Sequence, residues 1–458
     1  MKMKDTPPDV NRRDFIKGTS ASTLAMLMGG IELRAADQSQ PTEAPTQYNT
    51  TGEPLKCAVI GLGTRGRELL ATLAKLPNAP VVAICDSYEA FVKRAKAAAP
   101  EAETFADYKQ VLAKKEVEGV LIATPTPTHK ELVLAALAAG KHVYCEAPLA
   151  TTIDDARAIA QAARKHVKVN FQAGLQGRSY PHHHFLLTFV RTGALGRNVK
   201  AYTQWHKKQS WRRTSPNPDR EKELNWRLDS ATSLGLIGEI GVHQVDLANW
   251  IINALPVSVT GFGGLVNWSD GRDVPDSVEA VFEYPGKVFL TCEASLATSF
   301  DGENNVFYGT DAALMVRQNK AWMFKEVDAP LLGWEVYAKK DAFYKDTGIV
   351  LVANATKLAA QGKKPGEEPA DEKPALQDAL EAFASNSKVY GAAVEDFASN
   401  FDVNDAAALK DAVDNAMKNK MHAAGYKEGL EATVSVIKAN EAILKGERVK
   451  FQKEWFAL

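Results

Sequence analysis

A glycine-rich loop follows directly after the first buried strand that the sequence predicts. Residues 55–61 form a continuous apolar run, which is typical of a strand buried on both faces, and residues 57–66 read CAVIGLGTRG. Gly61, Gly63 and Gly66 permit, in order, a tight turn, close approach of a pyrophosphate and packing of helix on strand. This pattern predicts a dinucleotide site, in which the phosphates lie at a helix N-terminus beside Thr64 and Arg65.

An acidic residue lies where such a site needs one. Asp86 ends the second predicted strand, 81–86, at 20 residues beyond Gly66. Its carboxylate can accept hydrogen bonds from ribose hydroxyls and would repel a 2′-phosphate, which favours NAD over NADP as the cofactor. The alternative is that Asp86 only caps the end of its strand.

The remaining pattern predicts two domains. Up to residue 173, short apolar runs alternate with helical stretches, which is typical of a doubly wound parallel Rossmann sheet. We expect its strands at 55–61, 81–86, 117–124, 142–145 and 167–172, with helices at 65–76, 88–98, 130–139 and 153–165. From residue 174, strands follow one another with few helices between them, which predicts an open, largely antiparallel sheet. We expect those strands at 198–205, 257–265, 278–284, 287–294, 306–309, 313–317 and 449–451.

Domain boundaries follow from these changes. We expect a NAD-binding domain over 55–173 and an α+β substrate and oligomerisation domain over 174–458, with a helical insert at about 361–425. Helices are expected at 374–420 and 428–444. Residues 37–54 are polar and rich in proline, as in a linker.

The N-terminus resembles an export signal. Residues 11–17 read NRRDFIK, a weakly apolar stretch covers 19–31, and Arg34-Ala35-Ala36 ends it with small residues. These features predict a twin-arginine signal peptide over 1–36 and a periplasmic or otherwise exported protein that uses the twin-arginine machinery. An amphipathic helix is the alternative. Because free nucleotide is scarce outside the cell, an exported enzyme of this kind would have to carry its NAD tightly bound.

Composition excludes several other classes. The 55 Lys and Arg residues are balanced by 56 Asp and Glu residues, whereas a nucleic-acid binder usually has a basic excess. No apolar run reaches the roughly 20 residues of a membrane span. Four cysteines without CxxC or zinc-site spacing predict neither a disulfide scaffold nor a zinc site.

Four further segments carry a family resemblance. They are Ile122-Ala123-Thr124-Pro125 with His129, Gly140 to Ala150, Gln176-Gly177-Arg178, and Gly238 to Asp246. In order, spacing and context the chain resembles the Gfo/Idh/MocA oxidoreductases over about 55–330 and at the C-terminal helix. The resemblance implies oxidation or reduction of a sugar or cyclitol with NAD(P), often with retained cofactor, and homo-oligomers formed through the open sheet. It implies cofactor contacts for Thr124, Pro125, His129, Glu146, Ala147 and Pro148, and substrate contacts for Gln176, Arg178 and Asp246.

The chain departs from the family at two catalytic positions. The family's Glu-Lys-Pro is Glu146-Ala147-Pro148 here, so the lysine expected near the reacting hydroxyl is missing. Glu239 replaces the family's aspartate four residues before His243. That spacing places both side chains on one helix face, where Glu239 could fix the imidazole tautomer and raise its basicity. We therefore expect His243 and Glu239 to be catalytic; the alternative is a helix cap beside a core histidine.

Aromatic and basic residues gather early in the second domain. Trp205, Trp211 and Trp226 lie close to several lysines and arginines, as in sites that bind sugars. We expect Trp205 and Trp211 to contact substrate; a basic surface loop is the alternative. Within His182-His183-His184 we expect His182 to face substrate, and no metal, because three consecutive helical residues point in different directions.

Three functions remain open on this reading. The first is an NAD-dependent oxidoreductase acting on a hydroxyl of a sugar, cyclitol or glycoside. The second is an NAD-dependent glycoside hydrolase, similar to α-N-acetylgalactosaminidases of this fold, which oxidises, eliminates, hydrates and reduces back. The third is a non-catalytic protein that binds dinucleotide or sugar.

Overall fold

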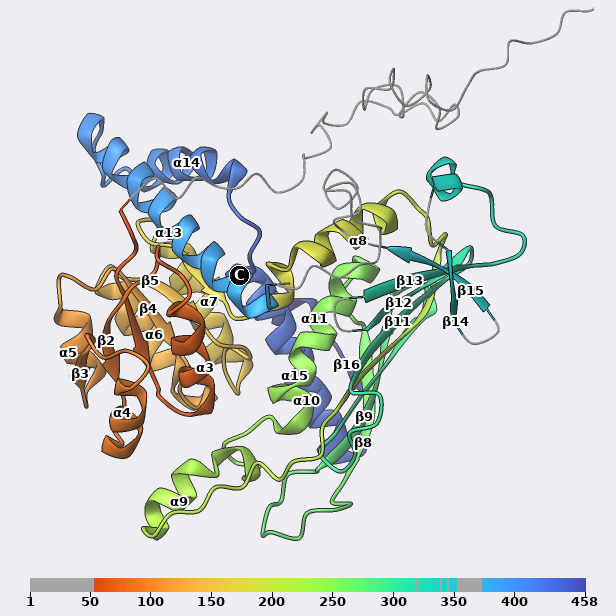
Figure 1. Cartoon of the computed structure of the whole chain (residues 1–458), viewed down its shortest axis with the longest axis horizontal. Coiled ribbons are helices and arrows are strands. Elements are labelled where there is room, and N and C mark those ends of the chain that lie inside the picture. Colours follow the sequence, from red (N-terminus) through yellow and green to blue (C-terminus); the bar gives the residue numbers. More distant parts are fainter. Residues whose placement is uncertain (1–52, 318–319, 338–339, 344–345, 352–372) are drawn as a thin grey trace, which may run out of the picture.

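The computed structural model describes residues 53–317, 320–337, 340–343, 346–351 and 373–458. The predicted signal 1–36, nearly all of the linker 37–54 and residues 361–372 of the predicted insert lie outside the described residues. Two bodies lie side by side in Figure 1, each built on its own sheet.

The first sheet has six parallel strands in the order β3-β2-β1-β4-β5-β6, which confirms the predicted Rossmann fold. From β1 the chain continues to β2 and β3 on one side, and from β4 it continues to β5 and β6 on the other side. The strand order therefore reverses between β1 and β4, and sheets of this kind bind ligands at that point. The strands are β1 (Cys57–Ile60), β2 (Val81–Cys85), β3 (Glu103–Phe105), β4 (Gly119–Ile122), β5 (His142–Cys145) and β6 (Phe171–Ala173).

Helices cover both faces of this sheet. One face packs on α5 (Tyr108–Ala113), α6 (His129–Ala138) and α7 (Ile153–Lys165). The other packs on α3 (Thr64–Leu73), α4 (Glu89–Lys96) and α13 (Ala375–Asn400). The sequence analysis did not predict β3 or α5.

The helix α13 packs on the nucleotide-binding half of the molecule. We expected the stretch around it to be an insert of the second domain, but its Phe383 packs edge-to-face on Tyr144 of β5 at 5.9 Å between ring centroids. Leu380 lies in the same buried cluster as Val59 and Leu121 of the parallel sheet. The chain thus returns to the nucleotide-binding half, where α13 fills a helix position over the sheet. A shorter helix, α14 (Ala406–Ala416), packs on α13 through Leu409 and Val413.

The second sheet has ten strands in the order β14-β15-β13-β12-β11-β7-β10-β9-β8-β16. All neighbours are antiparallel except β7 and β10, which confirms the predicted open, largely antiparallel sheet. The strands are β7 (Asn198–His206), β8 (Ser258–Gly264), β9 (Ser277–Tyr284), β10 (Val288–Ser295), β11 (Glu303–Gly309), β12 (Ala312–Arg317), β13 (Lys320–Lys325), β14 (Lys340–Phe343), β15 (Asp346–Leu351) and β16 (Val449–Lys450). The sequence analysis did not predict β13, β14 or β15.

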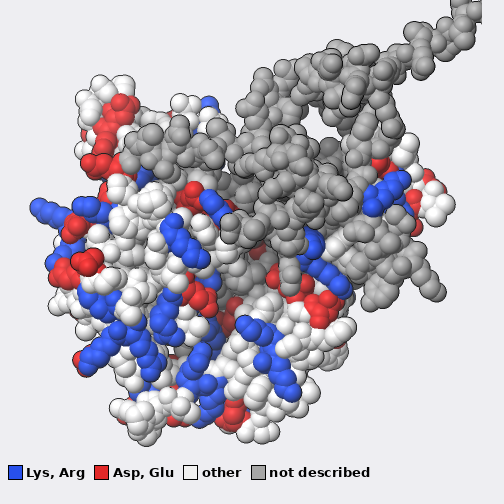
Figure 2. Space-filling model, viewed as in Figure 1, with Lys and Arg blue, Asp and Glu red and all other residues white. Residues whose placement is uncertain are grey.

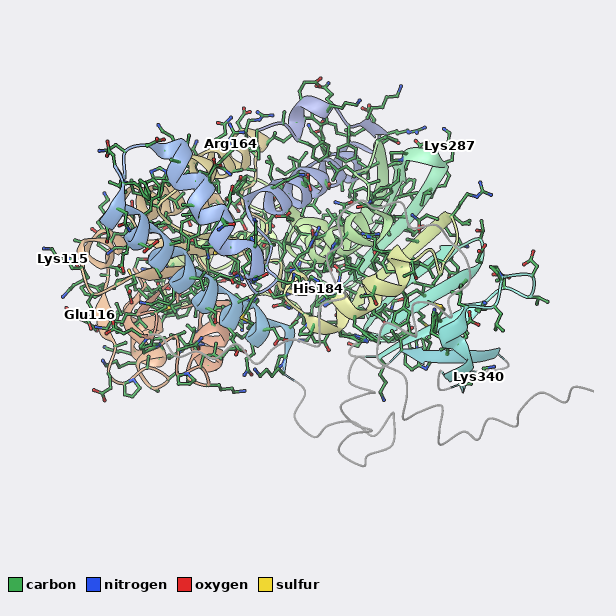
Figure 3. The ribbon with its side chains drawn as sticks, turned by 90° about the horizontal axis from the view of Figure 1, so that it is seen from above. Lys115, Glu116, Arg164, His184, Lys287 and Lys340 are labelled. Atoms are coloured by element: carbon green, nitrogen blue, oxygen red, sulfur yellow. The ribbon has the colours of Figure 1, made fainter. Side chains whose placement is uncertain are left out.

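Helices pack on one face of this sheet, the face toward the nucleotide-binding half (Figure 1). They are α8 (Pro181–Arg191), α10 (Gly235–Glu239), α11 (Gly241–Ile252) and α15 (Tyr426–Lys445). Seen from above in Figure 3, His184 of α8 lies where the two bodies meet, whereas Lys287 and Lys340 lie at the far side of the second sheet. None of the described helices is long and apolar enough to span a membrane.

Candidate active site

A cavity of about 630 Å³ lies between the two halves, beyond the carboxyl ends of β1, β4 and β5. Ala123 and Glu146 line it from the Rossmann sheet, while Trp205 and His243 line it from the second half. Parallel sheets bind ligands at this edge. The cavity therefore joins the predicted dinucleotide site to the predicted substrate site.

The glycine loop has the geometry of a phosphate cradle. Gly61 has a φ of +91°, and a Cβ there would lie 2.7 Å from the backbone of Ala123. A Cβ on Gly66 would lie 1.8 Å from the carbonyl oxygen of Gly61, whereas one on Gly63 would meet nothing within 4 Å. Gly63 is also the N-cap of α3, and no side chain caps that helix start. Open space thus faces uncapped N–H groups, which fits the pyrophosphate of NAD.

Asp86 follows β2 directly, at the rim of this cradle. Its Oδ2 accepts a hydrogen bond from the Leu62 N–H at 2.7 Å, and its Oδ1 accepts one from the Tyr88 N–H at 2.8 Å. Each carboxylate oxygen can accept a further bond. The backbone therefore holds the Asp86 carboxylate in a fixed orientation beside the glycine loop, where the predicted ribose contact requires it.

Arg65, in the first turn of α3, contacts two other predicted site residues, Glu146 and Gln176. Its Nε donates to Glu146 Oε1 at 2.8 Å, and its Nη2 donates to Gln176 Oε1 at 3.0 Å. Glu146 follows β5, and Gln176 begins the second half. The Arg65 side chain therefore ties the phosphate loop to the floor of the cavity. Burial raises the pKa of Glu146, while the positive charge of Arg65 acts against that shift.

His129 holds the loops after β4 and β5 together. Its Nε2 lies 3.0 Å from the Thr124 carbonyl oxygen, and its Nδ1 lies 3.1 Å from the Pro148 carbonyl oxygen. Burial lowers the pKa of His129 to about 4, so the ring is neutral at pH 7 and donates to one of the two carbonyls. Pro125 begins the short 3-10 turn of Thr126–Thr128 between them, and the Ala147–Pro148 peptide is cis. Thr124, His129 and Ala147 line the cavity.

His243 lies in the first turn of α11 and faces the cavity. Among the described residues, no hydrogen bond to its ring is found. Burial, and then the positive charge of Arg65, lower the pKa of His243 to about 4. At pH 7 the imidazole is therefore neutral and can accept a proton from a bound hydroxyl.

Glu239 does not orient His243, which corrects our expectation of a carboxylate–imidazole pair. The predicted single helix is broken at Ile240, so Glu239 ends α10 while His243 belongs to α11. The Glu239 carboxylate instead contacts Arg227, with Nε at 3.3 Å, and Thr126, whose Oγ1 donates at 3.4 Å. Its side chain is only 3% exposed, and burial raises its pKa.

Arg227 belongs to a segment that we call the arm, residues 207–234, which joins β7 to α10. Its guanidinium carbon lies 4.8 Å from the Trp226 ring centroid and 5.7 Å from that of Trp211, and the side chain lines the cavity. Sequence reasoning noted the basic character of the arm but did not select Arg227. With Ala147 also on the cavity wall, Arg227 brings a positive charge to a site that lacks the family's lysine.

The predicted substrate residues divide into two groups. Trp205, Trp211, Gln176 and Asp246 line the cavity, whereas Arg178 and His182 do not. Arg178 donates to both Asp246 oxygens at 2.9 and 2.8 Å and stacks on Trp250 at 4.6 Å, so its charge is satisfied inside the protein. His182 of α8 is buried, at 3% exposed, and the neighbouring His183 lines the cavity instead. The phase of the helix decides which of consecutive histidines faces the site.

No cluster of three or more His, Cys, Asp or Glu side chains suited to a metal ion is found in the described part of the chain. The four cysteines are free and buried, and burial raises the pKa of Cys85 and of Cys292 to about 12. Their thiols therefore stay protonated and pack as apolar groups.

Sequence and structure comparisons agree with this geometry. Residues 55–174 match the oxidoreductase family profile with an NAD-binding Rossmann fold, and residues 186–315 match a GFO/IDH/MocA C-terminal domain profile. An inositol 2-dehydrogenase of Acidothermus cellulolyticus is 28% identical over 247 residues, which cover 54% of this chain and 67% of the relative.

Two solved structures share the fold. Levoglucosan dehydrogenase in complex with NADH aligns with 87% of this chain and 100% of its own, with a TM-score of 0.64 and 17% identity. The aldose-aldose oxidoreductase of Caulobacter crescentus, complexed with glycerol, aligns with 87% and 100%, with a TM-score of 0.60 and 18% identity. From the glycine loop, the cavity at the strand ends and these matches, we conclude that the chain belongs to the Gfo/Idh/MocA family of NAD-binding oxidoreductases.

Proposed function

We propose that the protein is an NAD(H)-dependent oxidoreductase that oxidises or reduces a hydroxyl carbon of a sugar, cyclitol or glycoside. The observation that carries the proposal is the place of His243: its imidazole, neutral at pH 7 and without a hydrogen bond to any described residue, faces the cavity that the glycine loop also lines. When bound, NAD accepts or returns a hydride. The chain itself has to orient the hydroxyl and move its proton, and His243 Nδ1 or Nε2 takes that proton in the oxidative direction.

The cavity walls favour a polyhydroxylated ring. Trp205 and Trp211 offer flat apolar faces, and Arg227 offers donors for hydroxyl or carboxylate oxygens. In the absence of lysine at position 147, we assign to Arg227 the positive charge that stabilises the oxygen as it loses its proton. The names of the similar proteins, inositol 2-dehydrogenase and levoglucosan dehydrogenase, support this substrate class.

We further propose that NAD stays bound through turnover. The predicted twin-arginine signal implies an exported enzyme in an environment without free nucleotide. Such an enzyme regenerates its cofactor by oxidising one substrate and reducing another. The structural neighbour named an aldose-aldose oxidoreductase supports a cycle of this kind.

The experiment uses the full-length protein with its copurified nucleotide. Incubation with sugars, cyclitols and an aryl glycoside is followed by absorbance at the NADH band and by release of the aglycone. Net NADH formation, or its loss on adding a carbonyl acceptor, supports the oxidoreductase. Aglycone release without net redox change would show the glycosidase instead, and tight NAD binding with neither signal would show a non-catalytic protein.

A further inference from the structure

The arm reaches from the second half across to the nucleotide-binding half. In Figure 1 its helix α9 (Pro218–Leu224) lies below α3 and α4, away from the second sheet. Figure 2 shows Lys and Arg side chains gathered over this lower left part of the molecule. Two arginines of the arm contact the predicted dinucleotide site, one at each of its ends.

Arg220 of α9 lies at the ribose end of the site. Its guanidinium carbon is 4.2 Å from the Tyr88 ring centroid, and its Nη2 lies 3.7 Å from Asp86 Oδ1. Both charged groups are shielded, with side chains 18% and 11% exposed. The Nε of Arg220 is buried without a hydrogen-bond partner among the described residues. A buried donor without a partner destabilises the protein, so this position favours an additional acceptor.

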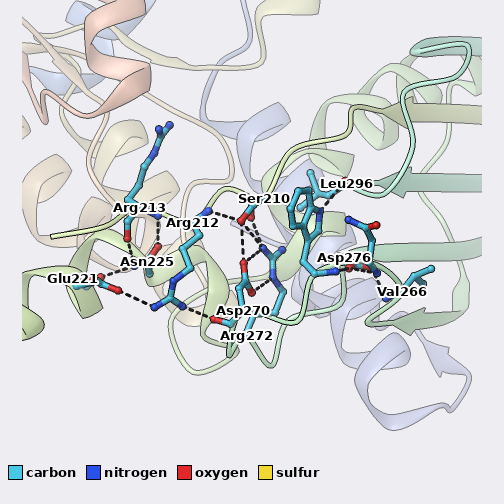
Figure 4. Close-up of polar contacts among 12 residues, drawn as sticks. Ser210, Arg212, Arg213, Glu221, Asn225, Val266, Asp270, Arg272, Asp276 and Leu296 are labelled. Atoms are coloured by element: carbon cyan, nitrogen blue, oxygen red, sulfur yellow. Dashed lines mark hydrogen bonds and ion pairs between the residues drawn. The ribbon is translucent and has the colours of Figure 1, made fainter.

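Arg213 lies at the phosphate end. Its Nη2 donates to Thr64 Oγ1 at 3.1 Å, and Thr64 is the residue directly after Gly63. Asn225 fixes the Arg213 backbone from both sides, accepting from its N–H at 2.8 Å and donating to its carbonyl oxygen at 2.8 Å. In Figure 4 the Arg213 side chain points away from this network. The guanidinium is thereby presented to the uncapped start of α3.

The base of the arm is anchored to the second half. Ser210 Oγ donates to Asp270 Oδ2 at 2.9 Å, and Arg212 Nη1 donates to the Asp270 carbonyl oxygen. Within the arm, Arg212 Nη2 donates to Glu221 Oε1 at 2.8 Å. Arg272 completes the network with Asp270 at 2.6 Å (Figure 4). Because these contacts hold the arm in place before any ligand arrives, little conformational entropy is lost when its arginines bind a ligand.

We propose that the arm completes the dinucleotide site, with Arg213 binding the pyrophosphate and Arg220 binding the adenosine ribose beside Asp86. Guanidinium groups form charge-assisted, often bidentate bonds with phosphate oxygens. A cofactor held from both halves leaves only when the arm moves away, so these arginines slow its dissociation. The inference deepens the proposed retention of NAD and is independent of the identity of the substrate.

The test measures NADH dissociation from the full-length protein. Protein loaded with NADH is mixed with excess NAD⁺ in a stopped-flow fluorimeter, and the decay of NADH fluorescence gives the rate constant. We expect R213Q and R220Q each to dissociate at least about 10-fold faster than wild type, and the double variant faster than either. The control K222Q removes an exposed charge from the same helix and should match wild type.

Unfolding temperatures without nucleotide separate binding from folding. Equal values for wild type and variants, together with faster dissociation, support direct cofactor contacts. Dissociation rates of R213Q and R220Q within twofold of a slow wild type overturn the role of the arm but leave cofactor retention intact. If wild type itself releases NADH as fast as the variants do, both the arm's role and the proposed retention are wrong.

Discussion

At the scale of single residues, the site depends on which charges are satisfied inside the protein and which face the cavity. Arg178 and Asp246 satisfy each other, and Glu239 is occupied by Arg227 and Thr126. His243 has no such partner among the described residues. The sequence motifs identified Arg178, Asp246, Glu239 and His243 but not Arg227 or Thr126, because pairing depends on side-chain direction, which a motif does not contain. The position of His243 at the cavity could be predicted from the motif, whereas the contacts of Glu239 with Arg227 and Thr126 could not.

Replacing the proton acceptor tests the chemistry directly. We expect His243→Ala to lower kcat by about 10²–10⁴-fold, which is the usual contribution of a positioned acid or base. Bound NAD should survive, because the glycine loop and Asp86 are untouched. Turnover and nucleotide content of the purified variant are the measurements, and turnover within about threefold of wild type would exclude His243 as the acceptor.

The pKa of His243 predicts an unusual pH profile. Because the pKa is lowered to about 4, the ring loses its accepting form only as the pH falls toward 4. At pH 5 about nine tenths of the imidazole is still neutral, whereas a histidine of ordinary pKa would be almost fully protonated. We expect the acid limb of kcat/KM for hydroxyl oxidation to lie near pH 4. A limb centred near pH 6.5 would contradict the buried environment of His243.

We expect Arg227 to supply part of the positive charge that the missing lysine would provide. R227Q should lower kcat/KM by about 10–100-fold, the cost of one or two charge-assisted hydrogen bonds, while R197Q, on an exposed loop outside the cavity, should not. Adding Ala147→Lys to R227Q restores a cation on the cavity wall and should recover part of the activity. An R227Q enzyme with wild-type kcat/KM would show that this charge is not used.

At the scale of elements, apolar runs predicted the buried strands well, because β1, β4 and β5 are covered on both faces. They failed at β3, an edge strand of three residues with little burial. They also failed at Ile240, where one predicted helix is two. The helix α13 itself was predicted within 374–420, but its packing on a sheet far away in sequence leaves no local signal. The contacts of the arm with Asp86 and Thr64 could not be predicted either, because they join residues that are far apart in the sequence.

The break at Ile240 has a measurable consequence. Since Glu239 and His243 lie on different helices and share no hydrogen bond, Glu239→Gln should leave the acid limb of kcat/KM within about 0.3 pH unit of wild type. The amide keeps the shape of the side chain but weakens its hold on Arg227, so KM should change. An acid limb that moves by about one pH unit or more would show that Glu239 does interact with His243, as the sequence spacing had indicated.

At the scale of the whole molecule, the second sheet differs from the first in being covered on one face only, within the described residues. Helices α10, α11 and α15 pack on its inner face, where Ala280 and Phe282 of β9 are buried. The outer face carries Phe262 of β8 and Phe289 of β10, which are 73% and 44% exposed. Contiguous apolar patches, unlike single exposed side chains, mark interaction surfaces, and these two phenylalanines lie on the same face, on strands separated only by β9.

We expect a second copy of the chain to cover this face, in agreement with the oligomers that the family resemblance implies. Phe262→Asp places a charge on this apolar face, which costs several kcal/mol of association when the charge is buried unpaired. Light scattering after size exclusion should show wild type as a homo-oligomer and Phe262→Asp as a smaller species with an unchanged unfolding transition at low concentration. Phe401→Asp, an exposed phenylalanine beyond α13 in the nucleotide-binding half, is the matched control and should assemble like wild type. A monomeric wild-type protein, or an assembly that Phe262→Asp leaves intact, would mean that the outer face of the sheet is not the interface.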